Sequence, residues 1–212
     1  GHGSGIGVEY GVQMVAALTW FWFHANQMHE ARSWYASILA ARFAKGAGEH
    51  APTAALALAH WGAGLMAMVE SDYQIAHSYL EESLAMARQI GDPFLLTVCL
   101  RELGLLKLYQ GDLGASDRYC RESLAQGRVA GSDWDLALAL FNIGNIANTL
   151  NDIPRAIAAY EECLGLFAKV HDERGIALVL AGLGLISCQQ GDYATARGHL
   201  ETSSMLMRNQ HN

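Results

Sequence analysis

The sequence predicts an all-α, right-handed superhelical solenoid of five antiparallel helix pairs, and three observations lead to this fold class. A skeleton with a period of 40 residues recurs four times: a glycine, an aspartate eight residues later and a small residue four further on. A capping side chain, aspartate or serine, returns about every 20 residues, at the spacing of helix starts. Between these points, apolar residues recur three and four positions apart, as in amphipathic helices. The predicted pairs are 8–25/28–44, 53–69/73–90, 93–110/113–130, 133–150/153–170 and 173–190/193–208.

Small residues at fixed repeat positions indicate how the two helices of a pair approach each other. A glycine inside a helix costs about 1 kcal/mol relative to alanine, so its return at one repeat position indicates a steric need. A bulky residue four positions after the small one should fill the adjoining space. The copies are Gly64/Asp72/Ala76 with Leu80, Gly104/Asp112/Ser116 with Cys120, Gly144/Asp152/Ala156 with Tyr160, and Gly184/Asp192/Ala196 with Leu200.

The predicted turns contain the capping residues that helix ends require. Oxygen-bearing side chains at each predicted helix start can accept hydrogen bonds from the free N–H groups of the first turn. Glycines just before four of them suit the left-handed residue that ends a helix. Pro93 and Pro154 lie in first turns, where a missing N–H costs little. The predicted caps are Asp72, Asp92, Asp112, Ser132 with Asp133, Asp152, Asp172 and Asp192, and the glycines are Gly91, Gly111, Gly131 and Gly191.

The first predicted pair differs from the others in its aromatic content. Trp20, Phe21, Trp22 and Phe23 follow one another, so they point all round their helix. They are either core residues with a terminal cap or a docking surface for a domain outside this segment, because exposed aromatic patches usually mark interfaces. The opening GHGSG is either a tag remnant or an arbitrary cut, and we expect the segment to be excised from a longer protein.

Composition and charge narrow the class of protein. A chain of 212 residues with 51% hydrophobic and 17% charged residues has a globular composition, and the repeats predict a single elongated domain over residues 1–212. The net charge of −7 argues against direct nucleic-acid binding. The most apolar run, residues 14–23, is about half of the ~20 residues that span a bilayer, so we expect no membrane insertion.

The chain carries no recognisable catalytic or metal motif. It contains neither a G-x-x-x-x-G-K-[ST] phosphate loop nor an HExxH pair, and its histidines are scattered. The paired acids Glu81-Glu82 and Glu161-Glu162 recur at one repeat position and mark a solvated face. Cys99, Cys120, Cys163 and Cys188 lack ligand spacing and sit in apolar helical patterns, which predicts buried free thiols and a cytoplasmic protein. We therefore expect no enzyme activity, cofactor or metal.

The order of Gly144, Ala156, Tyr160 and Cys163 resembles the tetratricopeptide repeat, although the period is 40 and not about 34. Longer units such as LEESLAMARQIGDPFLLTVCLRELGLLKLYQGD are similar to the C-terminal sensor arrays of bacterial signal-transduction ATPases of the MalT and LuxR-like activator type. The opening ALTWFWFHANQMHEARSWYASIL resembles the start of those arrays. The resemblance implies a cytoplasmic, effector-sensing array of a transcriptional regulator, with an ATPase module upstream.

The resemblance also implies that the first helix of each pair lines a concave groove. The mixture of Trp, Met, Tyr and Asn on these helices suits an amphipathic peptide, a protein segment or a small organic effector. Arg101 is the one cation on the expected face that could serve a carboxylate clamp. The candidate groove residues are Trp61, Leu65, Met68, Arg101, Leu105, Tyr109, Phe141, Asn142, Asn145, Asn148 and Gln189.

Three of these candidates are amides spaced three residues apart on one helix. Asparagine is a middling helix former, so Asn142, Asn145 and Asn148 need an explanation beyond propensity. In tetratricopeptide arrays such amides hold the backbone of a bound peptide, since an amide both donates and accepts. The alternative is that they bond to neighbouring helices and fix their register.

Two functions of different class remain open. The leading hypothesis is the effector-sensing array. The alternative is a stand-alone scaffold or adaptor that mediates protein–protein interaction or self-association, with a constitutive partner. Met205, Leu206 and Met207 leave apolar side chains that a further repeat could cover.

Overall fold

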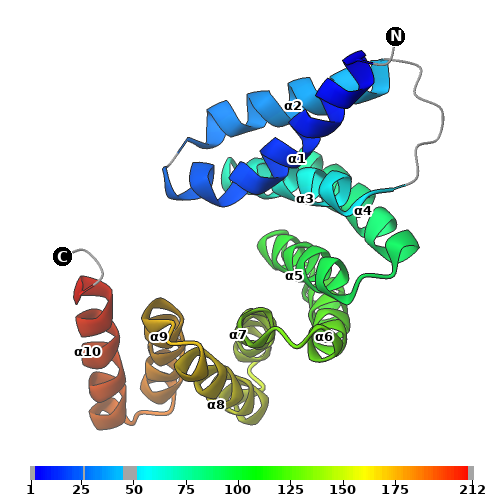
Figure 1. Cartoon of the computed structure of the whole chain (residues 1–212). Helices are drawn as coiled ribbons and strands as arrows, with labels where there is room; N and C mark the ends of the chain where they lie inside the picture. The colour runs from blue at the N-terminus through cyan, green and yellow to red at the C-terminus, as the bar shows by residue number, and fades with distance from the viewer. Residues whose placement is uncertain (1–2, 26, 45–51, 210–212) are drawn as a thin grey trace. The chain divides into compact units, whose positions relative to one another are not determined.

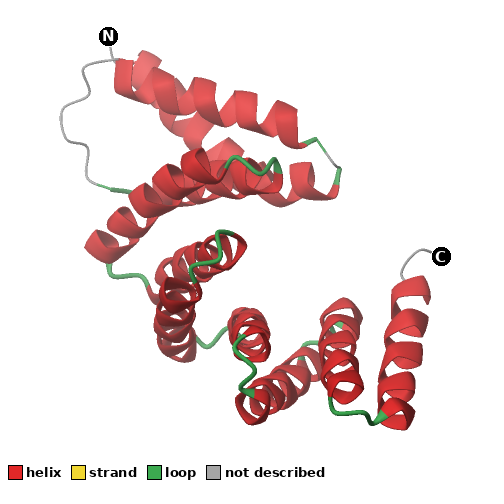
Figure 2. Cartoon of the chain, turned by 180° about the vertical axis from the view of Figure 1, so that it is seen from behind, coloured by secondary structure: helices red, strands yellow, loops and turns green. Residues whose placement is uncertain are grey.

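The computed structural model describes residues 3–25, 27–44 and 52–209. Within these ranges the chain is helical, with short connecting loops and no strand (Figure 2). The helices are α1 (Gly3–His24), α2 (Met28–Ala44), α3 (Ala54–Val69), α4 (Tyr73–Ile90), α5 (Pro93–Tyr109), α6 (Leu113–Ala130), α7 (Asp133–Thr149), α8 (Ile153–Lys169), α9 (Glu173–Gln189) and α10 (Tyr193–Asn209).

The all-α prediction is confirmed, and nine of the ten predicted helices end within one residue of the described bounds. The exception is α1, which begins at Gly3 and not at residue 8. The glycines near this end weaken a helix by about 1 kcal/mol each but do not forbid it, and extending an existing helix adds one hydrogen bond per residue.

The helices form two compact units, Gly1–Gln110 and Gly111–Asn212. Figure 1 colours the first unit from blue to green and the second from green to red. In the first unit α3 packs on α4, and α1, α2 and α5 pack around this pair. In the second unit α7 packs on α8 and α9 packs on α10. Because α5 and α6 belong to different units, their pairing stays a prediction, as do the single domain and the handedness.

The predicted caps are present at the helix starts. The carboxylate or hydroxyl oxygen of Asp72, Asp92, Asp112, Ser132, Asp152, Asp172 and Asp192 accepts a backbone N–H from the first turn. Asp133, which was predicted beside Ser132, is the first residue of α7, and Ser132 alone is its cap. Gly91, Gly111, Gly131 and Gly191 have positive φ, as predicted. Three further turns among the described residues use Ser71, Asn151 and His171 at φ 57–63°, which are not glycine and were not predicted.

Close packing within each pair explains the repeated glycine. A Cβ atom added at this position would meet the bulky residue of the second helix at 2.5–2.9 Å, so only glycine fits without movement. This holds for Gly64 against Leu80, Gly144 against Tyr160 and Gly184 against Leu200.

A second repeated contact ties each pair together. Three residues after the bulky position, a small polar side chain donates to the backbone carbonyl 26 residues earlier. Such a bond keeps a buried donor satisfied while the helices stay close. The three pairs within the units are Ser83 Oγ to Ala57 O (2.6 Å), Cys163 Sγ to Ala137 O (3.0 Å) and Ser203 Oγ to Ala177 O (2.7 Å).

The aromatic run of the first pair serves partly as core. Trp22 is buried and meets the ring of Tyr35 edge-on, at 5.6 Å between centroids. The Tyr35 hydroxyl donates to the Val15 carbonyl at 2.8 Å, and burial raises its pKa to about 12. Phe21 is exposed, as a docking surface would require. The side chains of Trp20 and Phe23 lie outside the described residues.

The thiol prediction needs one correction. Cys99, Cys120 and Cys163 are free and buried, as predicted, but Cys188 is free and only half-buried. Cys188 lies at the end of α9, one residue before Gln189, where the neighbouring helix covers it incompletely.

None of the described helices is both long and apolar enough to span a membrane.

Candidate functional site

The first unit contains a cavity of about 360 Å³ at the C-terminal ends of α3 and α5. Four predicted groove residues line it: Leu65 and Met68 from α3, and Leu105 and Tyr109 from α5. The other lining residues are Val69, Ser71, Tyr73 and Glu102. The structure therefore brings together residues that lie 40 positions apart in sequence.

Helix periodicity aims these side chains at the cavity. Glu102, Leu105 and Tyr109 are spaced at i, i+3 and i+7, which places them on one face of α5. Leu65 and Met68 have the same spacing on α3, which packs against α5. The wall is apolar, with two phenols and one carboxylate as its main polar groups.

The carboxylate is held by an ion pair within α5. Arg101 donates to Glu102 Oε1 from Nε at 3.2 Å and from Nη2 at 2.7 Å. Arg101 and Glu102 are only 3% and 6% exposed. The guanidinium predicted for the groove is therefore committed to a carboxylate of its own helix, which counts against a clamp for a ligand carboxylate.

Two tyrosines complete the cavity. The rings of Tyr73 and Tyr109 lie 6.2 Å apart between centroids, tilted by 30°. Burial raises the pKa of the Tyr109 phenol, and the negative charge of Glu102 and the neighbouring Tyr73 raise it further. Tyr109 is nevertheless 56% exposed, so its ring reaches solvent. Trp61, the remaining candidate on α3, is buried one turn earlier and is not among the lining residues given above.

The three amides of α7 have different surroundings. Asn142 is buried. Asn145 Oδ1 accepts a hydrogen bond from the Tyr160 hydroxyl at 2.6 Å, which favours the register-fixing interpretation for this residue. The Asn148 Oδ1 atom is buried and has no hydrogen-bond partner among the described residues.

Tyr160 also explains why the second unit differs from the first at this place. Asn145 and Gly182 occupy the repeat positions of Leu65 and Glu102. A Cβ atom on Gly182 would lie 2.8 Å from the Tyr160 ring, so this ring fills the space between α7 and α9. The ring of Phe141, another candidate groove residue, packs against the Tyr160 ring, with 6.0 Å between the two ring centroids. Gln189 is exposed at the end of α9.

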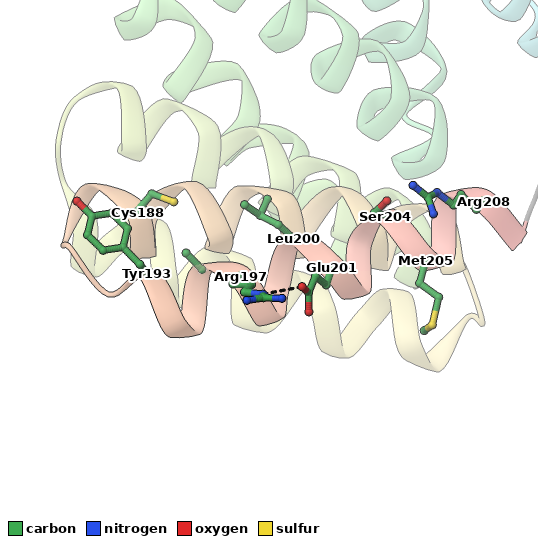
Figure 3. Close-up of a pocket in the computed structure, with 9 residues that line it drawn as sticks. Cys188, Tyr193, Arg197, Leu200, Glu201, Ser204, Met205 and Arg208 are labelled. Carbon is green, nitrogen blue, oxygen red and sulfur yellow. Dashed lines mark hydrogen bonds and ion pairs between the residues drawn. The ribbon is translucent and has the colours of Figure 1, made fainter.

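A second hollow, of about 650 Å³, lies along α10 in the second unit (Figure 3). Arg197 and Glu201 form an ion pair at 2.7 Å on its surface, beside Leu200 and Met205. Of the residues that line this hollow, only Met205 was predicted to be uncovered. The lining residues are Cys188, Tyr193, Ala196, Arg197, Leu200, Glu201, Ser204, Met205 and Arg208.

The repeat alignment would have located this hollow. Tyr193, Arg197 and Ser204 stand 40 residues after Ile153, Ile157 and Leu164, which pack on the buried cluster of the second unit. The hollow is therefore the α10 counterpart of an internal helix-packing face, with more polar side chains.

Comparisons with known proteins agree with this architecture. A tetratricopeptide repeat family model matches residues 95–169. BtubC (BKLC) from P. vanneervenii has a TM-score of 0.77 at 16% identity, over 98% of this chain and 84% of that chain. Aspartyl phosphate phosphatase F from Bacillus subtilis has a TM-score of 0.69 at 13% identity, over 94% and 60%.

The tetratricopeptide protein YrrB, described as having an unusual peptide-binding site, has a TM-score of 0.53 at 14% identity, over 91% of this chain and 84% of its own. No curated protein matches the sequence. At these identities the likeness concerns the fold alone. The chain is a tetratricopeptide-like helical-repeat array.

Proposed function

We propose that this chain is a non-catalytic sensor domain that binds an amphipathic peptide or a small organic effector in the first-unit cavity. The observation that supports this proposal is the cavity itself, which is lined by Leu65, Met68, Leu105 and Tyr109 from two helices. Its volume of about 360 Å³ falls within the ~300–1,000 Å³ of typical ligand sites. An apolar wall with a few fixed polar groups is also typical of such sites.

The regulator part of the proposal rests on the resemblance to sensor arrays of bacterial transcriptional activators, which implies an ATPase module upstream. Because three helices, α3, α4 and α5, contribute to the cavity, a ligand would favour one packing of these helices over others. It would regulate attached modules only through unequal affinity for the two arrangements. Sequencing the parent reading frame tests this part, and the expected result is a phosphate-binding loop upstream.

The binding part is tested by filling the cavity. Peptides are selected from a random 12-residue phage library on the wild-type chain, and their affinities are measured by calorimetry. Leu105→Trp should weaken binding about tenfold or more, because the larger ring would occupy cavity space that an anchoring side chain of the ligand needs, and such anchors contribute a kilocalorie or more per mole. The matched control is Leu185→Trp, at the same repeat position of the second unit and exposed. Equal binding by Leu105→Trp and wild type would reject the cavity as the site.

A scaffold or adaptor is the second candidate, and the hollow on α10 favours it. Tyr193 and Met205 are 72% and 56% exposed, and exposed apolar side chains of this size often mark interfaces. This function predicts association through that face. Analytical ultracentrifugation should then show an assembly that Met205→Glu abolishes, whereas a monomer at high concentration would count against self-association.

A further inference from the structure

We infer that the first-unit cavity recognises a positively charged ammonium group, carried by a lysine side chain of a peptide or by a small organic amine. This inference rests on the proposed function, because it specifies the chemistry of the ligand for that cavity. It starts from Glu102, a carboxylate that lines the cavity and is 6% exposed.

The carboxylate of Glu102 has acceptor sites beyond those that Arg101 uses. Two hydrogen bonds from Arg101, from Nε and from Nη2, end on its Oε1 atom. An ionised carboxylate offers about four acceptor sites, so it can accept a hydrogen bond from a ligand while it keeps these two. A ligand that donates, and not one that accepts, is therefore expected.

The helix ends add negative potential at the same place. Val69 and Tyr109, the last residues of α3 and α5, both line the cavity. A helix C-terminus carries roughly half a negative charge on its free carbonyl groups. The nearby start of α4 has the opposite polarity, but its Asp72 carboxylate accepts the Ile75 N–H. The charges of Arg101 and Glu102 offset each other, so the two helix C-termini leave the surroundings favourable to a cation.

The two tyrosines offer a further contact to a cation. Tyr73 and Tyr109 lie 6.2 Å apart between ring centroids, close enough for one ammonium group to lie within ~6 Å of both rings. Both phenols can also accept or donate a hydrogen bond. The apolar walls of Leu65, Met68 and Leu105 suit the alkyl or aryl body that carries the charge.

The repeat itself does not require the carboxylate. The equivalents of Glu102 in the other copies are Gly62, Asn142 and Gly182, none of them charged. Removing a carboxylate from water is costly unless it is paired, and here an arginine is buried beside it. A charged pair therefore stands at a position that other repeats fill with glycine or asparagine, and this charge is specific to the first-unit cavity.

The test compares three probes of one shape and different charge: 2-phenylethylamine, 2-phenylethanol and 3-phenylpropionate. Binding to the whole chain is followed at neutral pH by amide NMR titration. The amine should shift the amides of Leu105 and Tyr109 and bind about tenfold more tightly than the alcohol, as expected for one charge-assisted hydrogen bond. The propionate should bind more weakly than the alcohol.

Variants locate the charge preference. Glu102→Gln should reduce the amine-to-alcohol ratio to about one. Tyr109→Leu, at an exposed ring, should weaken the amine about two- to fivefold. Tyr193→Leu is the control, because Tyr193 holds the repeat position of Tyr73 in the second unit. If Glu102→Gln does not fold, the probe comparison on the wild type and Tyr109→Leu still decide.

Equal affinities for amine and alcohol would overturn the charge preference while leaving the cavity as a ligand site. Failure of the amine to bind, or a preference for the propionate, would also overturn it. The proposed function is judged separately, by the peptides selected on the wild type and their dependence on Leu105.

Discussion

Replacing Tyr160 and Asn145, singly and together, separates a structural amide from a ligand-binding one. Tyr160 is 1% exposed and its hydroxyl donates to Asn145 Oδ1 at 2.6 Å. Tyr160→Phe removes one neutral hydrogen bond and should cost about 1 kcal/mol of unfolding free energy. Asn145→Leu leaves a buried hydroxyl without its acceptor and should cost about 1–3 kcal/mol.

The double variant carries the sharper expectation. Tyr160→Phe with Asn145→Leu removes both partners, so its cost should fall below the sum of the single costs by about 1 kcal/mol. Urea unfolding followed by circular dichroism gives the three free energies, with Tyr193→Phe as an exposed control. The slope on urea must stay constant among the variants for the free energies to be compared.

Strictly additive costs would show that the hydrogen bond does not couple the two residues. An unchanged stability of Asn145→Leu, together with lost ligand binding, would refute the structural role and support the amide as a ligand contact. That second outcome is the one that the sequence-based hypothesis of a peptide-binding amide predicts.

Two further predictions follow from the buried thiols and phenols. Of the four cysteines, only Cys188 should react quickly with a thiol reagent at about pH 8. Burial raises the pKa of Cys99 to about 11 and that of Cys163 to about 12, so these two thiols stay protonated and unreactive. Rapid labelling of Cys99 and Cys163 in the folded chain would contradict this prediction. The free energy of unfolding should fall as the pH rises from about 9 toward 12. In the folded chain the phenols of Tyr35 and Tyr160 have a pKa of about 12, so they ionise at lower pH in the unfolded chain, which rising pH therefore favours. Urea midpoints at pH 8 and at about pH 10.5 measure this, and equal midpoints would refute it.

Helix bounds and caps were predictable because their causes are local. An aspartate such as Asp152 caps the helix that follows it through its own first turn, and Gly91 or Gly131 ends a helix through its own φ. The period of 40 residues then aligns the copies and predicts which helices pair. The steric need behind Gly144 was also predictable, although the atom it meets was not.

Part of the candidate site was predictable and part was not. Leu65, Met68, Leu105 and Tyr109 were placed on one surface by the resemblance to tetratricopeptide arrays, and the cavity brings them together. Glu102 was not among the predicted residues, although its signal was present as the one charged residue in a column of glycines and asparagine. The half-buried Cys188 shows the same limit, since an apolar helical pattern does not reveal how completely a neighbour covers it.

The fold class, the helix ends, the caps and the repeat positions of small residues follow from the sequence, because each depends on neighbours within one helical turn or one period. Which side-chain polar groups bond to other helices becomes clear only when the helices are packed. The Asn145 side-chain carbonyl of α7 accepts the hydrogen bond of the Tyr160 hydroxyl, which comes from α8. The hydrogen-bond partner of such a side chain depends on the distance between two helices. Because protein interiors are closely packed, one ring or one methylene group more or less decides whether a space between helices is open or filled.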